Sequence, residues 1–333
     1  MKRTALILLD HAVILLFAGV LLTFGFLAPG FLSWASLGNL LIQSSPTAVL
    51  AAGMTFVLMV AGVDLSVGAV MALAAAVAGK MMLGGFSMPL ALAAMLFMGP
   101  ACGLVNGLLV TRLHIAAFIA TLGTLWLGRG GALWITETRA MNLPDSFLHL
   151  GSSRLLGIPL PGIICAAVLA AGNVLLEQTP FGRQLRATGH SAVAAAKAGI
   201  NVRRLVTAAY VICGFCAALA GILVLGQLGA VSPKFGLNKE FAAIAAAVLG
   251  GTSLFGGRGA VFPGSLLGAA LIQAVENGLV AINANPYLYP VVTSAVIFVA
   301  VLLDTLRQRL RAAATRRIFP ETEAKAFSAS AAA

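Results

Sequence analysis

Long apolar runs, separated by short polar connections, recur along the whole chain. A helix crosses the ~30 Å hydrocarbon core of a bilayer with ~20 apolar residues, and most of the runs reach that length. The runs cover residues 7–28, 40–61, 66–84, 88–110, 117–137, 158–177, 205–228, 241–253, 260–280 and 287–304. The run at 241–253 is short, which predicts a half-helix or re-entrant segment whose free backbone groups are covered by protein. The pattern predicts an all-α, polytopic membrane protein with about ten transmembrane helices.

The basic residues gather at alternate connections between these runs. With the N-terminus inside, the inner connections and the C-terminal tail hold all but six of the 21 Lys and Arg residues. The exceptions are Arg129, which lies within a run, and Lys80, Arg139, Arg154, Lys234 and Lys239 in outer connections. Cytoplasmic loops carry an excess of Lys and Arg, so the asymmetry predicts that both termini are cytoplasmic.

The composition supports the membrane interpretation. Of 333 residues, 60% are hydrophobic and 9% charged, whereas soluble domains have ~45–50% and ~25%. The net charge of +11 is spread between apolar runs instead of lying on one soluble face, which argues against nucleic acid as a partner. The run 7–28 is longer than the ~7–15-residue core of a secretory signal, so we expect it to remain as the first helix. We expect residues 1–306 to form the transmembrane domain and residues 307–333 a basic, disordered cytoplasmic tail.

The inner connection 178–204 is long and hydrophilic. Its middle, HSAVAAAKAGI, is rich in Ala, which favours a short helix because Ala is the strongest helix former. Gly199 is suited to end that helix, and arginines flank the segment on both sides. Two interpretations stay open: a helix that seats in a groove of a partner, or an ordinary basic loop that obeys the positive-inside rule.

Four segments, in order along the chain, carry a family resemblance. They are AGVDLSVGAVMAL (61–73), FIATLGTLWLGRG (118–130), FGRQLRATGHSAVAAAKAGINVRRL (181–205) and AAVLGGTSLFGGRG (246–259). Together they resemble the ribose/xylose/autoinducer-2 class of bacterial ABC sugar-importer permeases, and the likeness extends from about residue 40 to 305. The sequence departs from the family at Ala116-Ala117, where the family usually has proline.

The resemblance implies the permease subunit of an ATP-driven sugar importer in the bacterial inner membrane, without a cofactor, a metal or catalytic residues. The implied partners are an ATPase subunit, an external sugar-binding protein and a second permease chain, identical or related, surrounded by membrane lipid. The chain has no G-x-x-x-x-G-K-[ST], the motif that cradles nucleotide phosphates, so ATP is expected on a separate chain. In the family the connection matching 178–204 contacts the ATPase. This likeness assigns coupling to Gly189, His190, Ala194, Ala195, Gly199 and Ile200.

Polar residues within apolar runs are candidates for the substrate pathway, because charges in the bilayer are costly and mark function. We expect Arg129 and Glu276 to approach one another or to line the sugar path, unless Arg129 extends outward to the interface. Asn106, Gln273 and Asn277 are further candidates, although amides also hold helices together.

Glycine patterns predict close packing and turns. G-x-x-x-G occurs at Gly103/Gly107 and Gly264/Gly268 and permits close contact between helices, within one chain or between two. The Gly-rich turns GVDLSVG and GGTSLFGGRG are expected at the cytoplasmic membrane surface. There, Asp64 or Ser66 is suited to cap the following helix.

The alternatives are an ion-coupled secondary transporter and an intramembrane enzyme. An ion-coupled secondary transporter needs an ionisable relay near the middle of the membrane, and the chain offers few such groups. An intramembrane enzyme needs a nucleophile–base pair or a metal cluster within the spans. The four histidines instead lie at span ends or in connections, and Cys213 and Cys216 lie in an apolar run as packing residues.

Overall fold

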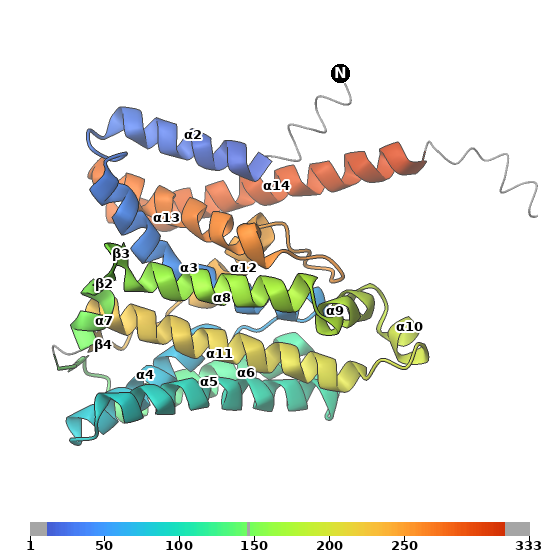
Figure 1. Ribbon diagram of the computed structural model, residues 1–333, viewed down its shortest axis with the longest axis horizontal. Helices are drawn as coiled ribbons and strands as arrows, with labels where there is room; N and C mark the ends of the chain where they lie inside the picture. Colours follow the sequence, from blue (N-terminus) through green and yellow to red (C-terminus); the bar gives the residue numbers. More distant parts are fainter. Residues whose placement is uncertain (1–11, 145–146, 317–333) are drawn as a thin grey trace, which may run out of the picture.

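The computed structural model describes residues 12–144 and 147–316. In this part of the chain, most of the long helices run in one general direction and form an elongated bundle (Figure 1). The long helices are α2 (Ala12–Leu27), α3 (Trp34–Met59), α4 (Val67–Leu83), α5 (Met88–Thr111), α6 (Ala117–Thr136), α8 (Leu160–Glu177), α11 (Val202–Leu228), α12 (Lys239–Leu249), α13 (Leu266–Ala281) and α14 (Tyr289–Arg316).

Shorter elements connect the long helices. They are α7 (Leu148–Ser152), α9 (Pro180–His190), α10 (Ala192–Lys197), η2 (Val261–Ser265), η3 (Pro286–Leu288), β1 (Met141–Asn142), β2 (Arg154–Leu155), β3 (Ile158–Pro159) and β4 (Ala230–Val231). Strands β1 and β4 pair antiparallel with Met141 opposite Val231, and β2 pairs with β3 in the same sense.

The long helices coincide with the predicted apolar runs, and residues 7–11 of the first run lie outside the described residues. Within the described residues, five helices are long and apolar enough to cross a membrane: α3, α5, α8, α11 and the segment Val261–Ala281. Helix α12 has only 11 residues and is therefore about 16 Å long, which is shorter than the ~30 Å hydrocarbon core and agrees with the short apolar run at 241–253.

The C-terminal boundary differs from the prediction. Helix α14 continues to Arg316, so the expectation of disorder from residue 307 onward is wrong as far as this helix extends. The remainder of the predicted tail, 317–333, lies outside the described residues.

Helices α3 and α11 form the centre of the bundle. Every residue of α3 from Ser44 to Met59 is buried, and α11 buries Tyr210 completely. The Oγ of Ser33 starts α3 by accepting the backbone N–H of Ser36 at 3.3 Å, which satisfies one of the free donors of the first turn.

Contacts between distant segments define two ends of the bundle. At one end, the backbone N–H of Gly257 donates to the carbonyl of Met59 at 2.9 Å, beside α9 and α10 (Figure 1). At the opposite end, Lys80 and Glu137 approach to 3.6 Å, and strand β1 pairs with β4. We call these the α10 end and the β end.

Glycines bring helices of this one chain into close contact. On α5, a Cβ added at Gly103 would collide with the backbone of Tyr210 on α11, and one at Gly107 would lie 2.8 Å from the Cα of Thr207. Gly268 of α13 faces the backbone of Ala246 on α12 in the same way. Both G-x-x-x-G pairs therefore serve packing within the chain.

This packing gives a stability prediction. We expect Gly103→Ala to lower the free energy of unfolding by about 1–3 kcal/mol, because the added methyl group forces two backbones apart. The measurement is thermal or denaturant unfolding of the purified protein in detergent. Gly123→Ala on α6 is the matched control, because a Cβ there meets nothing within 4 Å. Equal stability of the two variants would contradict close packing at Gly103.

Candidate functional site

The connection between α8 and α11 folds as two short helices, α9 and α10. The Oγ of Ser191 starts α10 by accepting the N–H of Ala194 at 3.2 Å. Gly199, at φ +82°, ends it, and the N–H of Ile200 closes back on the carbonyl of Ala195 at 3.1 Å. The predicted short helix with Gly199 at its C-terminal end is confirmed.

Helix α10 presents a small apolar surface to its surroundings. It lies at the extreme end of the bundle (Figure 1), and of its residues only Ala195 is buried. Ala194 is exposed, and the side chain of Val193 is 68% exposed. Exposed apolar side chains on a short projecting helix are typical of a surface that another molecule covers.

The base of this segment is packed tightly against the bundle. A Cβ added at Gly189 would collide with the carbonyl of Met59 and the backbone of Gly257, and Gly257 lies directly against the His190 ring. The His190 Nδ1 is also 2.8 Å from the carbonyl of Arg186. Closely packed backbones cannot rearrange as flexible side chains can. A displacement of α9 would therefore also displace the end of the central helix α3 and the 250–260 connection.

A cavity of about 600 Å³, in which half of the lining residues are polar, lies toward the β end. It is bordered by helices α3, α12, α13 and α14, and its polar side chains come from α3, α13, α14 and Asn238, the residue before α12. These side chains are Gln43, Asn238, Gln273, Glu276, Asn277, Thr293 and Ser294. Phe241 and Tyr289 add aromatic surface. We call this the outer cavity.

The polar groups of the outer cavity form a connected set. The Gln273 Nε2 donates to the Asn277 Oδ1 at 2.9 Å and to the Gln43 Oε1 at 3.2 Å. Gln273, Glu276 and Asn277 follow one another at the i, i+3, i+4 spacing that places side chains on one face of a helix. The buried Thr293 Oγ1 has no partner among the described residues. Polar groups facing lipid would be costly, whereas facing a water-filled cavity they can bind a hydroxylated solute.

Arg129 serves a different site. Its Nη1 donates to the backbone carbonyl of Phe235 at 2.5 Å, and the carboxylate that acts on it electrostatically is Glu240. Glu276 instead lines the outer cavity, so the expected approach of Arg129 to Glu276 is wrong. Arg129 anchors the connection that leads into α12.

Asn106 lies in an interior network away from the outer cavity. It is fully buried on α5, and its Nδ2 donates to the Ser66 Oγ at 2.8 Å and to the Asp64 Oδ1 at 3.4 Å. The same Asp64 oxygen accepts the N–H of Ser66 at 2.9 Å. Asn106 therefore joins α5 to the connection between α3 and α4, which is the interhelical role that amides often play.

The turn at Asp64 also differs from the expectation. Neither side chain caps α4: Ser66, the residue before the helix, makes no capping bond, and Asp64 bonds to Ser66 itself. Asp64 is 1% exposed, so this turn is enclosed by the bundle and does not lie on its surface. Burying a carboxylate requires such hydrogen bonds because an unpartnered charge is costly in the interior.

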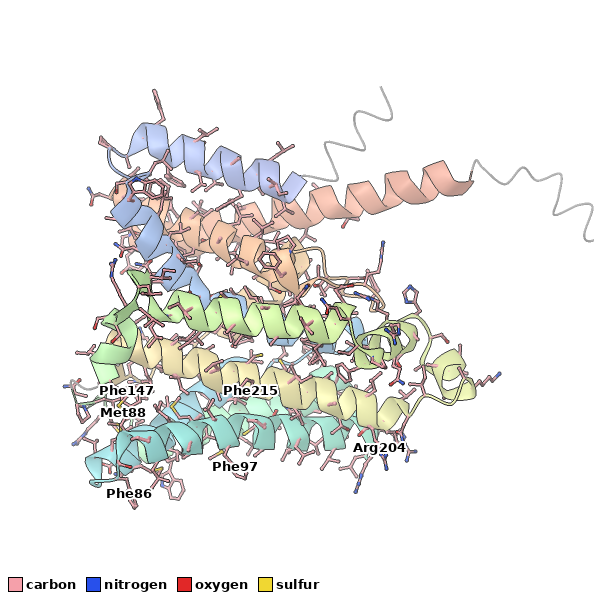
Figure 2. The ribbon with its side chains drawn as sticks, viewed as in Figure 1. Phe86, Met88, Phe97, Phe147, Arg204 and Phe215 are labelled. Atoms are coloured by element: carbon pink, nitrogen blue, oxygen red, sulfur yellow. The ribbon has the colours of Figure 1, made fainter. Side chains whose placement is uncertain are left out.

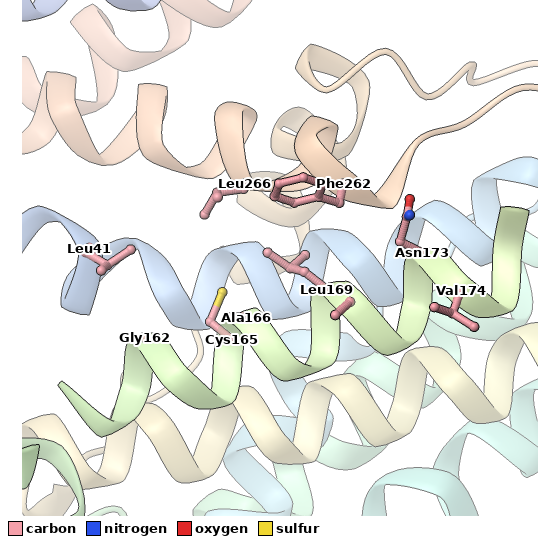
Figure 3. Close-up of a pocket in the computed structure, with 10 residues that line it drawn as sticks. Leu41, Gly162, Cys165, Ala166, Leu169, Asn173, Val174, Phe262 and Leu266 are labelled. Carbon is pink, nitrogen blue, oxygen red and sulfur yellow. The ribbon is translucent and has the colours of Figure 1, made fainter. Parts of the chain in front are cut away.

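A second cavity, of about 310 Å³, lies between α3, α8 and the segment around Phe262 (Figure 3). Its lining is apolar apart from Asn173. One amide cannot satisfy the several hydroxyls of a sugar, so this cavity does not suit a hydrophilic solute.

Sequence reasoning found three residues of the outer cavity and missed others. Gln43 is a polar residue within the apolar run 40–61 and therefore carried a signal; so did Glu240, which lies beside Arg129 and does not line the outer cavity. Thr293 and Ser294 carried none, because hydroxyls are common in membrane helices. Within the described part of the chain, no three His, Cys, Asp or Glu side chains gather where they could hold a metal ion.

A cavity with several polar side chains lies toward one end of the helix bundle, and a protruding helix is braced on the central helix at the other end. Both features fit a membrane transport subunit. The family described as "Branched-chain amino acid transport system / permease component" matches residues 36–301, most of the chain. The chain belongs to this family, and it is a transport permease. The resemblance identified from the four sequence segments is confirmed.

Several relatives that match along most of their length are named as sugar permeases. The ribose import permease protein of Haemophilus influenzae is 38% identical over 281 residues, 83% of this chain and 87% of the relative. The galactofuranose transporter permease protein of Escherichia coli is 40% identical over 272 residues, covering 81% and 79%. The D-allose transport system permease protein of Escherichia coli is 37% identical over 288 residues, covering 85% and 87%. No solved structure matches the chain.

Proposed function

We propose that this chain forms the translocation pathway of an ATP-driven, binding-protein-dependent sugar importer. It crosses the inner membrane about ten times with both termini in the cytoplasm, so that the α10 end is cytoplasmic and the β end faces outward. The positive-inside pattern supports this orientation. ATP is hydrolysed on a separate subunit, and two permease chains, identical or related, complete the pathway.

The observation that carries the proposal is the construction of the α9–α10 segment. Helix α10 exposes Val193 and Ala194 to a partner, and Gly189 at the base of the segment lies against the carbonyl of Met59. A partner that moves α10 therefore moves the end of α3. The six residues assigned to coupling by family resemblance all belong to this segment or its exit.

The solute class follows from the chemistry of the outer cavity. Amides and hydroxyls both donate and accept hydrogen bonds, and aromatic rings cover the apolar face of a sugar ring. The relatives are named for ribose, galactofuranose and D-allose, which are neutral sugars rich in hydroxyl groups. We infer that a neutral monosaccharide, delivered by an external binding protein, enters through Gln273, Glu276 and Asn277.

Nucleotide drives the cycle by differential affinity. ATP binds more tightly to the closed ATPase pair than to the open pair. This difference in affinity shifts the equilibrium of the permease between its inward-open and outward-open states. Because α3 lines the outer cavity with Gln43 and ends at Met59 against α9, the same helix touches both places.

Reconstituted uptake tests the proposal. We expect vesicles that contain the permease, its ATPase subunit and the binding protein to accumulate sugar only when ATP is supplied on the side of the ATPase subunit. Collapse of the proton gradient at constant ATP should leave uptake unchanged. Accumulation by this chain alone, driven by an ion gradient, would show an ion-coupled secondary transporter instead.

A further inference from the structure

A groove of about 840 Å³ lies between α5 and α11, where α5 ends and α11 begins. Arg112, Arg203 and Arg204 stand at its rim together with the amide of Asn201. Figure 2 shows Arg204 at the α10 end of the bundle, far from Met88 and Phe147 at the β end. The groove therefore lies at the α10 end of the bundle.

The local structure fixes the rim. The Asn201 Oδ1 accepts the N–H of Arg204 at 3.1 Å and so starts α11 with Arg203 and Arg204 in its first turn. Thr111 and Thr207 hold the two helices together through their hydroxyls, 3.1 Å apart. The first turn of a helix also presents free N–H groups, which favour an anion.

The floor of the groove is apolar and open to the outside of the bundle. It is formed by Leu104, Leu108, Val211 and Ile212, and Leu104 is 45% exposed. Only 22% of the most apolar stretch of α5 is buried. This helix therefore lies at the periphery of the bundle, where lipid surrounds a membrane protein.

The charge of the groove is one-sided. Among the described residues that line it, none is acidic, whereas Arg186 in the neighbouring α9 pairs with Glu177. A guanidinium matches the oxygens of a phosphate with two parallel hydrogen bonds. Phosphate chemistry at the rim and hydrocarbon chemistry at the floor together describe an amphiphile, because a soluble phosphate would leave the floor unused.

We propose that this groove binds an anionic phospholipid, whose phosphate contacts Arg112, Arg203 and Arg204 and whose acyl chain lies along Leu104 and Leu108. Basic pockets between transmembrane helices at the cytoplasmic side bind lipids of this kind. The inference rests on the orientation proposed above but not on the identity of the solute. The bound lipid holds the start of α11, and thus the exit of the α9–α10 segment, at the membrane surface.

Lipid titration of the full-length protein in mild detergent, followed by native mass spectrometry, tests the site. We expect phosphatidylglycerol to bind at least about tenfold more tightly than phosphatidylcholine. The double variant R203Q/R204Q should weaken phosphatidylglycerol binding roughly thirtyfold, since each basic residue near an anionic headgroup contributes about fivefold. R183Q/K197Q, which removes two exposed cations from α9 and α10, is the matched control and should bind as the parent does.

A second variant separates lipid from free phosphate. Leu108→Trp keeps all three arginines and fills the floor, so it should weaken phosphatidylglycerol binding while R112Q weakens it through the rim. Displacement of the lipid by millimolar inorganic phosphate would overturn the proposal in favour of a soluble anion. Loss of lipid on addition of the ATPase subunit would make the groove a protein interface, and unchanged binding by R203Q/R204Q would remove the site altogether. None of these measurements involves transport, so each leaves the proposed function to its own test.

Discussion

Val193→Glu should abolish ATP-driven sugar uptake while leaving the permease folded. The side chain is 68% exposed on α10, so the substitution costs the isolated chain little. In a complex the same position is expected to be desolvated by the ATPase subunit, and an unpaired carboxylate buried in an interface is strongly unfavourable. Loss of an interface hot spot reduces the binding free energy by ~2–4 kcal/mol. This corresponds to an affinity for the ATPase that is lower by roughly thirtyfold to a thousandfold.

The measurement is binding of the ATPase subunit to the purified permease, with uptake in vesicles as the second readout. Leu156→Glu is the control: Leu156 is an exposed apolar residue, 95% accessible, in the turn between β2 and β3 at the β end. It introduces the same charge and should leave ATPase binding intact. If Val193→Glu bound the ATPase and supported uptake like the parent, α10 would not be the docking helix.

The sequence predicted those parts of the fold that depend on local pattern. Apolar runs gave the positions of the long helices because a membrane span must be apolar over its whole length. The Ala-rich stretch and Gly199 gave α10 because helix propensity and a C-terminal glycine act over a few residues. Helix α9 was missed because FGRQLRATGH is polar and carries no span signal.

The contacts that make the site required the tertiary structure. Gln43 and Gln273 are 230 residues apart in the chain, and nothing local marks them as neighbours. Arg129 was paired with the wrong partner because its main acceptor is a backbone carbonyl, that of Phe235. A carbonyl is present at every residue, so it leaves no sequence signal, whereas the carboxylate of Glu276 was conspicuous in an apolar run.

Replacement of the amides of the outer cavity should have the second large effect. Q273L/N277L removes the hydrogen-bonding groups that connect α13 to Gln43 and keeps side chains of similar size. Sugar hydroxyls that lose these partners are left unsatisfied in a partly enclosed cavity, at about 1–3 kcal/mol per group. We expect uptake at low sugar concentration to fall about fivefold to 150-fold for each lost hydrogen-bonded group, because 1.4 kcal/mol corresponds to a factor of ten.

Initial rates of uptake at several concentrations of sugar-loaded binding protein, in vesicles with ATP, measure this loss. Binding of the ATPase subunit should not change, since α10 lies at the other end of the bundle (Figure 1). Asn173→Leu makes the same kind of replacement in the apolar cavity lined by α8, and uptake should persist there. If Asn173→Leu impaired uptake as much as Q273L/N277L, the solute would pass along α8. Loss of this single amide can reduce uptake to that extent only if the sugar forms a hydrogen bond with it.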